Sequence, residues 1–385
     1  MNISIMKKRI IPISLPSMGQ EEWDATKDPI FSGWVTQGPK VAEFERIFAH
    51  RHQVKHAIAV SNCTTALHLA LVAIGVKEGD EVIIPSFTWV ATANAVLYCN
   101  ATPVFVDIDI STFNIDPKEV AKKITKKTKA IIPVHLFGLC ANVDAIIKIA
   151  PGIAIVEDAA CAAGAALNGN PAGSLGDIGC FSFHPRKSIT TGEGGMVTTN
   201  NDALAEKINM LRNHGASVSE EQRHHGPKPY ILPAFDMVGY NYRMTDLQGA
   251  VGVVQLKKLD LFIDERQKWA EYYTNELKNI PWLITPKISK EYKHGWQSYV
   301  CMIDETKSPI SRNEVMEYLQ ERGISTRPGT HAVHMLGYYS KTYHINPNDF
   351  INSYYANEYS IAIPLHNKMT KDDFEYVVST LHELK

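Results

Sequence analysis

The chain has 385 residues, of which 45% are hydrophobic and 21% charged, and its formal net charge is −2. This length suits one large domain plus a smaller one, and a near-neutral charge without a long basic run excludes a nucleic-acid-binding surface. The six cysteines show no CxxC spacing, no signal peptide is recognised, and no stretch approaches the roughly 18 apolar residues of a membrane span. We therefore expect a cytoplasmic protein with no disulfide framework, metal site or membrane contact.

Short apolar strands alternate with helices from about residue 57 to residue 200. Beyond the first of them, the strands are β-branched and apolar on both faces, which is typical of central parallel strands covered by helices. This alternation predicts an α/β layered domain, whose ligands bind at the carboxyl ends of the strands. The expected strands are 57–60, 82–85, 103–107, 130–134 and 153–156, and the expected helices are 92–98, 117–124 and 143–149.

The first strand leads into a polar turn and a helix of strong helix formers, in the run AIAVSNCTTALHLAL at 57–71. Backbone N–H groups at the helix N-terminus and the hydroxyls of Thr64 and Thr65 form an anion site, which the helix dipole favours. Ordinary capping of the helix by Ser61 or Thr64 is the alternative. The turn matches neither a Walker loop nor GxGxxG, so we do not expect it to bind a nucleoside triphosphate.

Two later strands end in an acid and a lysine, in the runs IAIVEDAA at 153–160 and FSFHPRKSITTGEGG at 181–195. A pyridoxal phosphate (PLP) enzyme needs these two groups. Lys187 would form a Schiff base with the cofactor aldehyde and move protons as the free amine, and Asp158 would keep the pyridine nitrogen protonated. A solvated loop lysine and a helix-capping aspartate are the alternatives. The pairing of both groups with the anion site favours the PLP interpretation.

The pattern changes in the last third of the chain. A long helical stretch over about 245–278 is followed by residues that indicate a smaller α+β domain. The stretch 215–234, rich in His, Gly, Pro and charge, indicates an exposed loop. We predict a large PLP-binding domain with an N-terminal cleft segment at 1–260, and a smaller C-terminal domain at 261–385.

Four segments occur in the order seen in one known family: SNCTTALHLAL at 61–71, VEDAA at 156–160, FHPRKSITTGEGG at 183–195 and GYNYRMTD at 239–246. The chain resembles the DegT/DnrJ/EryC1/StrS family of PLP-dependent sugar aminotransferases over essentially its whole length. The resemblance implies an aspartate aminotransferase-like PLP fold (type I), with a large, mostly parallel-sheet domain and a smaller α+β C-terminal domain.

The resemblance also implies roles for individual residues around the cofactor. Trp89 matches the aromatic residue that stacks on the pyridine face, and Ser182 matches one that helps to hold the phosphate. Asn241 matches a residue that reaches the phosphate from the neighbouring subunit, which implies a homodimer with shared active sites. A core tryptophan and a locally bonded strand hydroxyl are the alternatives for Trp89 and Ser182. Arg243 is a weaker candidate in the loop of Asn241, where a structural ion pair is equally expected.

Two positions depart from the family pattern. Cys63 stands where the phosphate turn usually has a glycine, and Cys161 stands where a glutamine often hydrogen-bonds the phenolic oxygen of the cofactor. A thiol is a much weaker hydrogen-bonding partner, so the contact of Cys161 with the cofactor is expected to be weak. We expect a buried structural role for these thiols and not a catalytic one.

Three residues are expected on the substrate side of the site. The segment 32–39 resembles the N-terminal segment that lines the substrate cleft in the family, and it contains Trp34. Arg327 and His331 lie where relatives carry substrate-proximal Arg and His residues, and an arginine suits a diphosphate or a carboxylate. Ordinary loop polarity is the alternative for both residues.

The lysine segment resembles family members that act at sugar C4 more than those that act at C3. We therefore predict transfer of the amino group of L-glutamate to a nucleotide-linked 4-keto-6-deoxyhexose, giving an amino-dideoxy sugar nucleotide for a polysaccharide, glycan or antibiotic. A 3-keto sugar or a cyclitol is the alternative acceptor. A sugar dehydratase is disfavoured because those relatives carry histidine in place of Lys187. A non-enzymatic regulator is disfavoured because it has no physical reason to retain Lys187 with Asp158.

Overall fold

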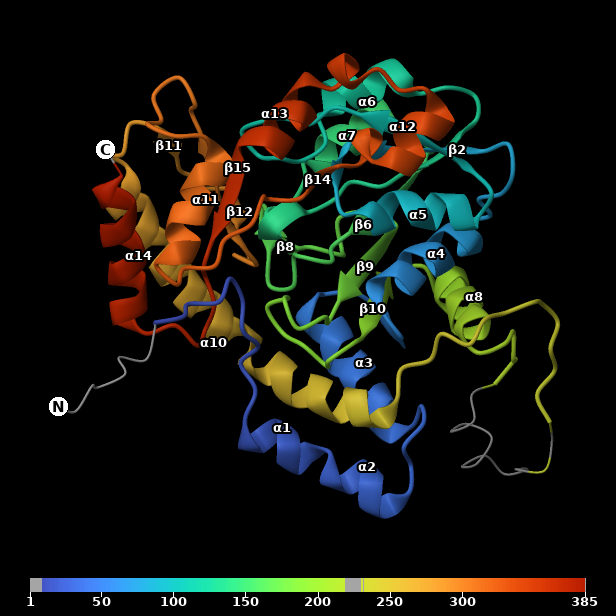
Figure 1. Cartoon of the computed structure of the whole chain (residues 1–385). Coiled ribbons are helices and arrows are strands. Elements are labelled where there is room, and N and C mark those ends of the chain that lie inside the picture. The colour runs from blue at the N-terminus through green and yellow to red at the C-terminus, as the bar shows by residue number, and fades with distance from the viewer. Residues whose placement is uncertain (1–8, 219–229, 231, 385) are drawn as a thin grey trace.

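A seven-stranded sheet forms the centre of the larger lobe of the protein (Figure 1). The structure is a computed structural model that describes residues 9–218, 230 and 232–384. The strands, in order across the sheet, are β1 (His56–Val60), β10 (Gly195–Thr199), β9 (Ile178–Ser182), β6 (Ala154–Asp158), β5 (Thr128–Ile131), β2 (Glu81–Pro85) and β4 (Thr102–Val106). Strand β10 is antiparallel to both of its neighbours, and the other pairings are parallel. These pairings confirm the predicted α/β domain with a mostly parallel sheet.

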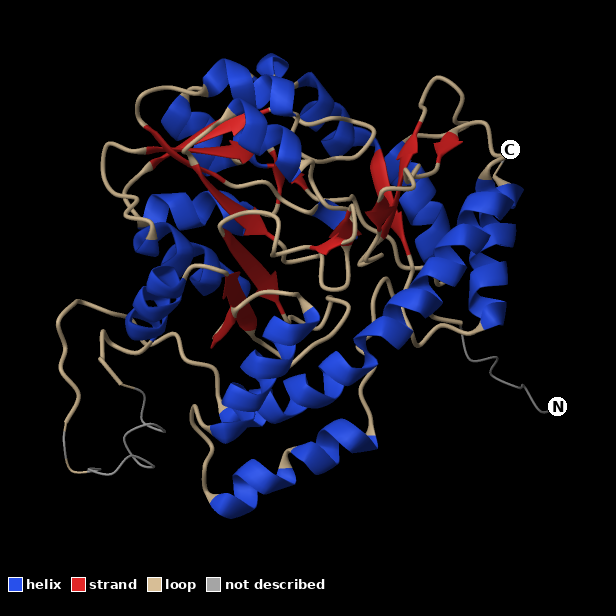
Figure 2. Cartoon of the chain, turned by 180° about the vertical axis from the view of Figure 1, so that it is seen from behind, coloured by secondary structure: helices blue, strands red, loops and turns tan. Residues whose placement is uncertain are grey.

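Helices cover both faces of this sheet because successive side chains of a strand point to opposite faces (Figure 2). Val82 and Ile84 of β2 lie in the core formed with α4, α5 and α8, whereas Ile83 packs with Val120 of α6 and Ile146 of α7. Helices α3 and α10 cover the second face at the β1 end of the sheet. The bounds of these helices are α3 (Pro39–Arg51), α4 (Cys63–Ala73), α5 (Val90–Tyr98), α6 (Pro117–Lys123), α7 (Val143–Ile149), α8 (Asp202–Arg212) and α10 (Asp246–Leu277).

Strand β4 lies at the edge of the sheet, although its apolar sequence was expected of a central strand. Its residue Phe105 is buried, and the ring centroid of Tyr339 in α12 (Gly337–Tyr343) lies 5.6 Å from that of Phe105. The C-terminal part of the chain therefore returns to cover this edge. A covered edge strand carries the same apolar residues as a central one, which is why its sequence was misleading.

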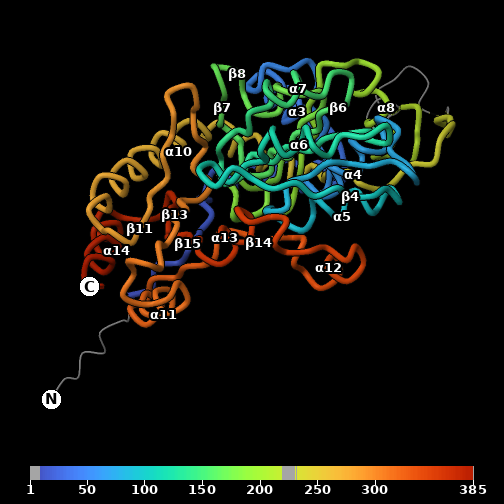
Figure 3. The backbone as a smooth tube through the Cα atoms, turned by 90° about the horizontal axis from the view of Figure 1, so that it is seen from above, coloured from blue at the N-terminus to red at the C-terminus, as the bar shows by residue number. Residues whose placement is uncertain are grey.

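The smaller lobe has its own core and is joined to the sheet by α10 (Figure 3). Helix α10 confirms the helix predicted at about 245–278. Its residue Phe262 packs in the core of the larger lobe, while Tyr273 and Leu277 pack in the smaller one. The predicted domain division at residues 260 and 261 falls inside this helix and stays a prediction. The main elements of the smaller lobe are β11 (Leu283–Ile284), β13 (Tyr299–Ile303), β15 (Ser360–Ile363), α11 (Arg312–Glu321) and α14 (Lys371–Glu383).

Short strands connect the smaller lobe to the carboxyl end of the sheet. Strand β3 (Phe87–Thr88), which follows β2, pairs with β14 (His331–Ala332), and β12 (Tyr292–Lys293) pairs with β7 (Ala166–Leu167). Strand β7 also pairs with β8 (Asn170–Pro171). The other helical elements are α1 (Gln20–Ala25), α2 (Lys27–Ser32), α13 (Ile351–Tyr359), and the 3₁₀ turns η1 (Leu136–Gly138), η2 (Val333–Met335) and η3 (Pro347–Asp349).

Within the loop predicted at 215–234, residues 219–229 and 231 lie outside the described part of the chain. Among the helices that the structure describes, none combines the length and the apolar character needed to cross a membrane.

Candidate active site

Asp158 is the last residue of β6, and its carboxylate is buried at the carboxyl end of the sheet. The hydroxyl of Thr92 donates a hydrogen bond to its Oδ2 at 2.8 Å, and the N–H of Ala160 donates to its Oδ1 at 3.2 Å. Burial raises the pKa of Asp158, and these two hydrogen bonds and the nearby charge of Lys187 oppose the rise. A buried acid of this kind is stabilised by a cationic partner. Sequence reasoning missed Thr92, which is an ordinary residue in the first turn of α5.

Lys187 lies in the turn between β9 and β10, beside the end of β6. Its Nζ lies 3.2 Å from the sulfur of Cys161, three residues beyond Asp158. The backbone of the turn is fixed by a hydrogen bond from the N–H of Lys187 to the carbonyl of His184 at 2.9 Å. The side chain of Gln297, from the loop before β13, donates to the carbonyl of Arg186 at 2.9 Å. The structure therefore brings the predicted lysine, acid and thiol together, because parallel strands end at one edge of a sheet.

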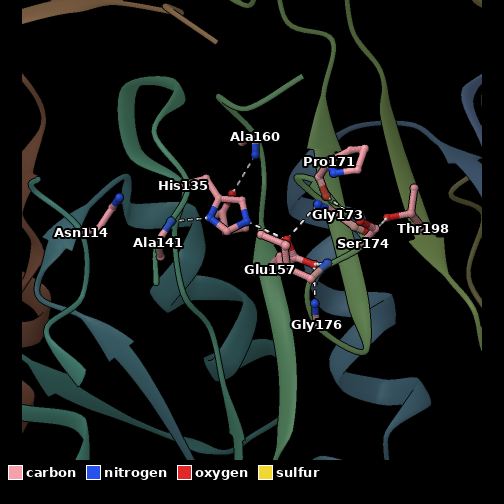
Figure 4. Close-up of polar contacts among 12 residues, drawn as sticks. Asn114, His135, Ala141, Glu157, Ala160, Pro171, Gly173, Ser174, Gly176 and Thr198 are labelled. Atoms are coloured by element: carbon pink, nitrogen blue, oxygen red, sulfur yellow. Dashed lines mark hydrogen bonds and ion pairs between the residues drawn. The ribbon is translucent and has the colours of Figure 1, made fainter. Parts of the chain in front are cut away.

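A buried histidine, His135, and a buried glutamate, Glu157, interact at the end of β6 (Figure 4). The carboxylate of Glu157, on the opposite face from Asp158, lies 2.7 Å from Nε2 of His135. It also accepts hydrogen bonds from the N–H groups of Gly173, Leu175 and Gly176. The sequence offered one signal for this network, the acid beside Asp158, but no indication that His135 is its partner.

The imidazole of His135 is held in one tautomer by its neighbours. The N–H of Ala141 donates to its Nδ1 at 3.0 Å, so the proton of a neutral ring lies on Nε2 and faces Glu157 (Figure 4). The backbone of His135 is itself tied to Asp158, since its N–H donates to the carbonyl of Asp158 at 3.0 Å. This network holds the strand that carries the acid.

The predicted anion site lies at the N-terminus of α4, next to the start of β10. The side chain of Asn62 caps the helix by accepting the N–H of Thr65 at 2.9 Å, and the hydroxyl of Thr65 donates to the carbonyl of Asn62 at 2.8 Å. The hydroxyl of Thr65 is thus used in the cap. Thr64 makes no side-chain hydrogen bond within the described residues, so its hydroxyl and the free N–H groups of the first turn remain for a phosphate.

Ser182 lies close to this helix N-terminus. It is the last residue of β9 and pairs with Gly195 of β10. A Cβ on Gly195 would lie 2.5 Å from the backbone carbonyl atoms of Asn62, so only glycine lets the strand lie this close to the turn before α4. The end of β9 therefore lies near the N-terminus of α4. The hydroxyl of Ser182 accepts the N–H of His184 at 3.4 Å, the local bond of the alternative, and its contact with a phosphate stays a prediction.

Asn241 lies on the surface, in a loop that is fixed to the same region. The carbonyl of Tyr242 accepts the N–H of Ser61 at 2.8 Å, and Nη1 of Arg243 donates to Oδ1 of Asn213 at 2.8 Å. The side chain of Asn241 is exposed. Its predicted contact with the phosphate of a neighbouring subunit stays a prediction, whereas Arg243 has a structural partner in its own chain.

The N-terminal cleft segment is anchored by Asp246, the first residue of α10. Its buried carboxylate accepts the N–H groups of Gly38, Lys40 and Val41 at 2.8–3.0 Å and thereby caps α3. Trp34 is half-buried and donates from Nε1 to the carbonyl of Gln37 at 3.0 Å. Trp34 is thus folded against its own segment, and its contact with a substrate stays a prediction.

Trp89 and His331 come together where β3 pairs with β14. The pairing of β3 with β14 sets His331 opposite Thr88, and the ring centroids of Trp89 and His331 lie 5.6 Å apart. The indole of Trp89 is 58% exposed, which contradicts the alternative of a core tryptophan.

Arg327 carries a guanidinium that is partly unsatisfied. Its Nε is buried and has no hydrogen-bond partner in the described part of the chain. Burial lowers the pKa of Arg327, and the nearby charge of Arg186 lowers it further. An arginine suits an anionic ligand, so the unpartnered Nε of Arg327 fits the predicted substrate role, which stays a prediction.

The residues at this edge of the sheet fit PLP. Asp158 suits the ring nitrogen, Lys187 suits the aldehyde, and Trp89 offers an exposed aromatic face. Thr64, Ser182 and the N-terminus of α4 suit the phosphate. When bound, PLP supplies an aldehyde that takes up an amino group and a ring that accepts electrons.

Comparison with known proteins agrees with this chemistry. The model of the DegT/DnrJ/EryC1/StrS aminotransferase family matches residues 16–382. Spore coat polysaccharide biosynthesis protein SpsC of Bacillus subtilis is 38% identical over 381 residues, 98% of each chain, and GDP-perosamine synthase of Caulobacter vibrioides is 38% identical over 378 residues, 97% of this chain and 98% of the relative. The solved PLP form of putative sugar aminotransferase Spr1654 from Streptococcus pneumoniae has a TM-score of 0.90 at 27% identity, over 98% of both chains. The chain therefore belongs to the DegT/DnrJ/EryC1/StrS aminotransferase family and is a PLP-dependent sugar aminotransferase.

Proposed function

We propose that this enzyme moves the amino group of L-glutamate to C4 of a nucleotide-linked 4-keto-6-deoxyhexose. The observation that carries the proposal is the lysine turn, in which Lys187 lies beside Asp158 at the end of β6 within the segment FHPRKSITTGEGG. The likeness to a GDP-perosamine synthase and to SpsC supports a nucleotide-linked amino sugar made for a polysaccharide.

The side chains of this chain have separate tasks in the transfer. Lys187 Nζ takes the proton from the α-carbon of L-glutamate, and in the second half-reaction it delivers a proton to the sugar carbon that receives the nitrogen. Asp158 holds a proton on the pyridine nitrogen, and the hydrogen bonds from Thr92 and Ala160 keep its carboxylate in place. The half-satisfied Arg327 binds an anionic group of the substrate, a carboxylate or a diphosphate.

We also propose a cytoplasmic homodimer in which each subunit completes the other's site. Asn241 is exposed beside the anion site, and the loop before it carries exposed apolar side chains. Leu232, Phe235 and Val238 are 61–89% exposed, which suits the buried core of a subunit interface better than contact with water.

A half-reaction screen tests the acceptor. The purified enzyme is converted to its pyridoxamine form with L-glutamate, the donor is removed, and GDP-, UDP- and dTDP-4-keto-6-deoxy sugars are added separately. Return of the visible absorbance of the pyridoxal form with one of them supports the proposal and names the nucleotide. A response only to a 3-keto sugar or a cyclitol contradicts amination at C4. Lys187→Ala, which should respond to none of the acceptors, is the matched control.

A further inference from the structure

The side chain of Cys161 touches the amine of Lys187, the reacting group of the proposed function. Its sulfur lies 3.2 Å from Nζ, and no ion pair in the described part of the chain includes Lys187. Cys161 is also the half-buried member of a set of six cysteines whose other five are buried. The direct partner of the amine is therefore the sulfur of a cysteine and not a carboxylate.

The turn that carries Cys161 is held rigidly. The N–H of Ala159 donates to the carbonyl of Cys180 in β9 at 2.9 Å, and the N–H of Ala162 donates to the carbonyl of Ala159 at 2.9 Å. Both alanines are fully buried. On this fixed backbone, the position of the sulfur depends on the single χ1 angle of the side chain. The same turn sets Asp158 and Cys161 three residues apart, one for the ring and one for the lysine.

Charged and titratable groups lie around the pair. The charge of Lys187 opposes the rise in the pKa of Asp158, and Cys161 opposes the fall in the pKa of Arg327. The other titratable groups that face the pair are Cys63 from α4 and His184 from the lysine turn. Among the described residues, Cys161 supplies the side-chain atom to which Nζ donates a hydrogen bond.

We propose that Cys161 is a positioning residue whose thiol holds the amine of Lys187 in place for proton transfer. This inference rests on the proposed function, since it needs Lys187 to be the group that moves the proton. A carboxylate in the same place would hold the amine as an ammonium ion, which cannot accept a proton from the α-carbon of the donor. An alanine would leave the amine without its orienting contact.

Two pairs of variants test the proposal in the PLP-loaded enzyme. Cys161→Asp and Cys161→Asn are similar in size and differ in charge, whereas Cys161→Ala removes the contact and Cys161→Ser restores a hydrogen-bonding group. The measurements are the stopped-flow rate of the L-glutamate half-reaction across pH, and the midpoint of the pH titration of the visible absorbance without donor.

We expect Cys161→Asp to shift both the rate profile and the absorbance midpoint to higher pH by about 1–3 units, and Cys161→Asn to shift neither. Cys161→Ala should slow the half-reaction about 3- to 10-fold, the worth of one ordinary hydrogen bond, and Cys161→Ser should recover most of that loss. If Cys161→Asp does not fold, the comparison of Cys161→Ala with Cys161→Ser still tests the proposal.

Equal titration midpoints in the Asp and Asn variants, or wild-type rates in Cys161→Ala, would overturn the proposal and leave Cys161 as a packing residue. The readouts use only L-glutamate and the absorbance of the enzyme. A wrong sugar acceptor would therefore leave these results unchanged. If Lys187→Ala still shows the visible absorbance of the wild type, Lys187 is not the residue that binds the cofactor. That result would show that the proposed function itself has failed.

Discussion

Glu157 and Asp158 are adjacent acids on one buried strand, and their replacement by amides should have opposite effects. The carboxylate of Glu157 accepts hydrogen bonds from the ring of His135 and from three backbone N–H groups. In Glu157→Gln, one of the two acceptor oxygens becomes an NH₂ group. Two of the four donors then lose their acceptor, whichever way the amide is turned. The ring of His135 cannot adapt, because its Nδ1 already accepts the N–H of Ala141.

The size of the loss follows from these contacts. A buried donor left without an acceptor costs about 1–3 kcal/mol, so two of them cost about 2–6 kcal/mol of folding free energy. An unfolding entropy of about 2.1 cal/mol/K per residue over the chain turns this cost into a fall in Tm of about 3–7 °C. The chemistry at Lys187 should survive, because Glu157 faces away from the site.

Asp158→Asn should behave in the reverse way. Burial raises the pKa of Asp158, so a neutral amide relieves a desolvation cost; its oxygen can accept the N–H of Ala160, and the hydroxyl of Thr92 can turn to accept from its NH₂ group, so neither partner is lost. We expect an unchanged or higher Tm and a loss of about 10²- to 10³-fold in the rate of the L-glutamate half-reaction, since an electrostatic partner of the reacting ring is removed.

The assay is thermal unfolding of the cofactor-free proteins, because a ligand that binds only the folded state raises Tm, together with the half-reaction rate of the PLP-loaded ones. The reasoning is refuted if Glu157→Gln melts within about 1 °C of the wild type, far below the expected cost of two unmatched donors. It is equally refuted if Asp158→Asn loses as much stability as Glu157→Gln, which would show that both acids serve only the fold.

Two further predictions concern subunit assembly and acid stability. Mixing inactive Lys187→Ala and Asn241→Ala subunits under exchange conditions should restore activity to about a quarter of the wild-type level, since half of the dimers are hybrids and one site of each is intact; no recovery would show that Asn241 acts within its own chain or on its fold. Tm should fall steadily between pH 6.5 and pH 4. Three buried imidazoles stay neutral in the folded protein, whereas the same histidines take up protons near pH 6.5 in the unfolded chain. This difference costs up to about 1.4 kcal/mol of folding free energy per histidine and pH unit. Their stabilising effect is complete above pH 6.5, and a flat Tm across this range would contradict it. Burial lowers the pKa of these histidines to about 3 for His52, about 3 for His294 and about 4 for His366.

The amino-acid sequence alone determined the fold class, and it predicted the two central groups of the candidate site. Apolar strands alternating with helices specify a parallel sheet, and groups at the carboxyl ends of parallel strands meet at one edge. Lys187 and Asp158 could therefore be paired without a structure. The long connecting helix α10 was likewise evident, because its helical pattern runs without interruption for 32 residues.

Only the tertiary structure decided which of the predicted side chains can still contact a ligand and which residues pack beside them. Thr64 and Thr65 are equivalent in the sequence, but the helix cap consumes the hydroxyl of Thr65. The partnership of Trp89 and His331 depends on the pairing of β3 with β14, between residues far apart in the chain. Which donor meets which acceptor across such separations depends on the whole packing of the lobes, and local patterns carry no information about it.

The same reason explains the misjudged edge strand and the unexpected position of the thiol beside Lys187. Strand β4 is apolar because α12 returns to cover it, and Cys161 lies on the lysine because β6 and β9 are neighbours in the sheet. Periodicity records how buried a residue is, but not which element buries it. The order of strands and the return path of the C-terminal segment supply that information.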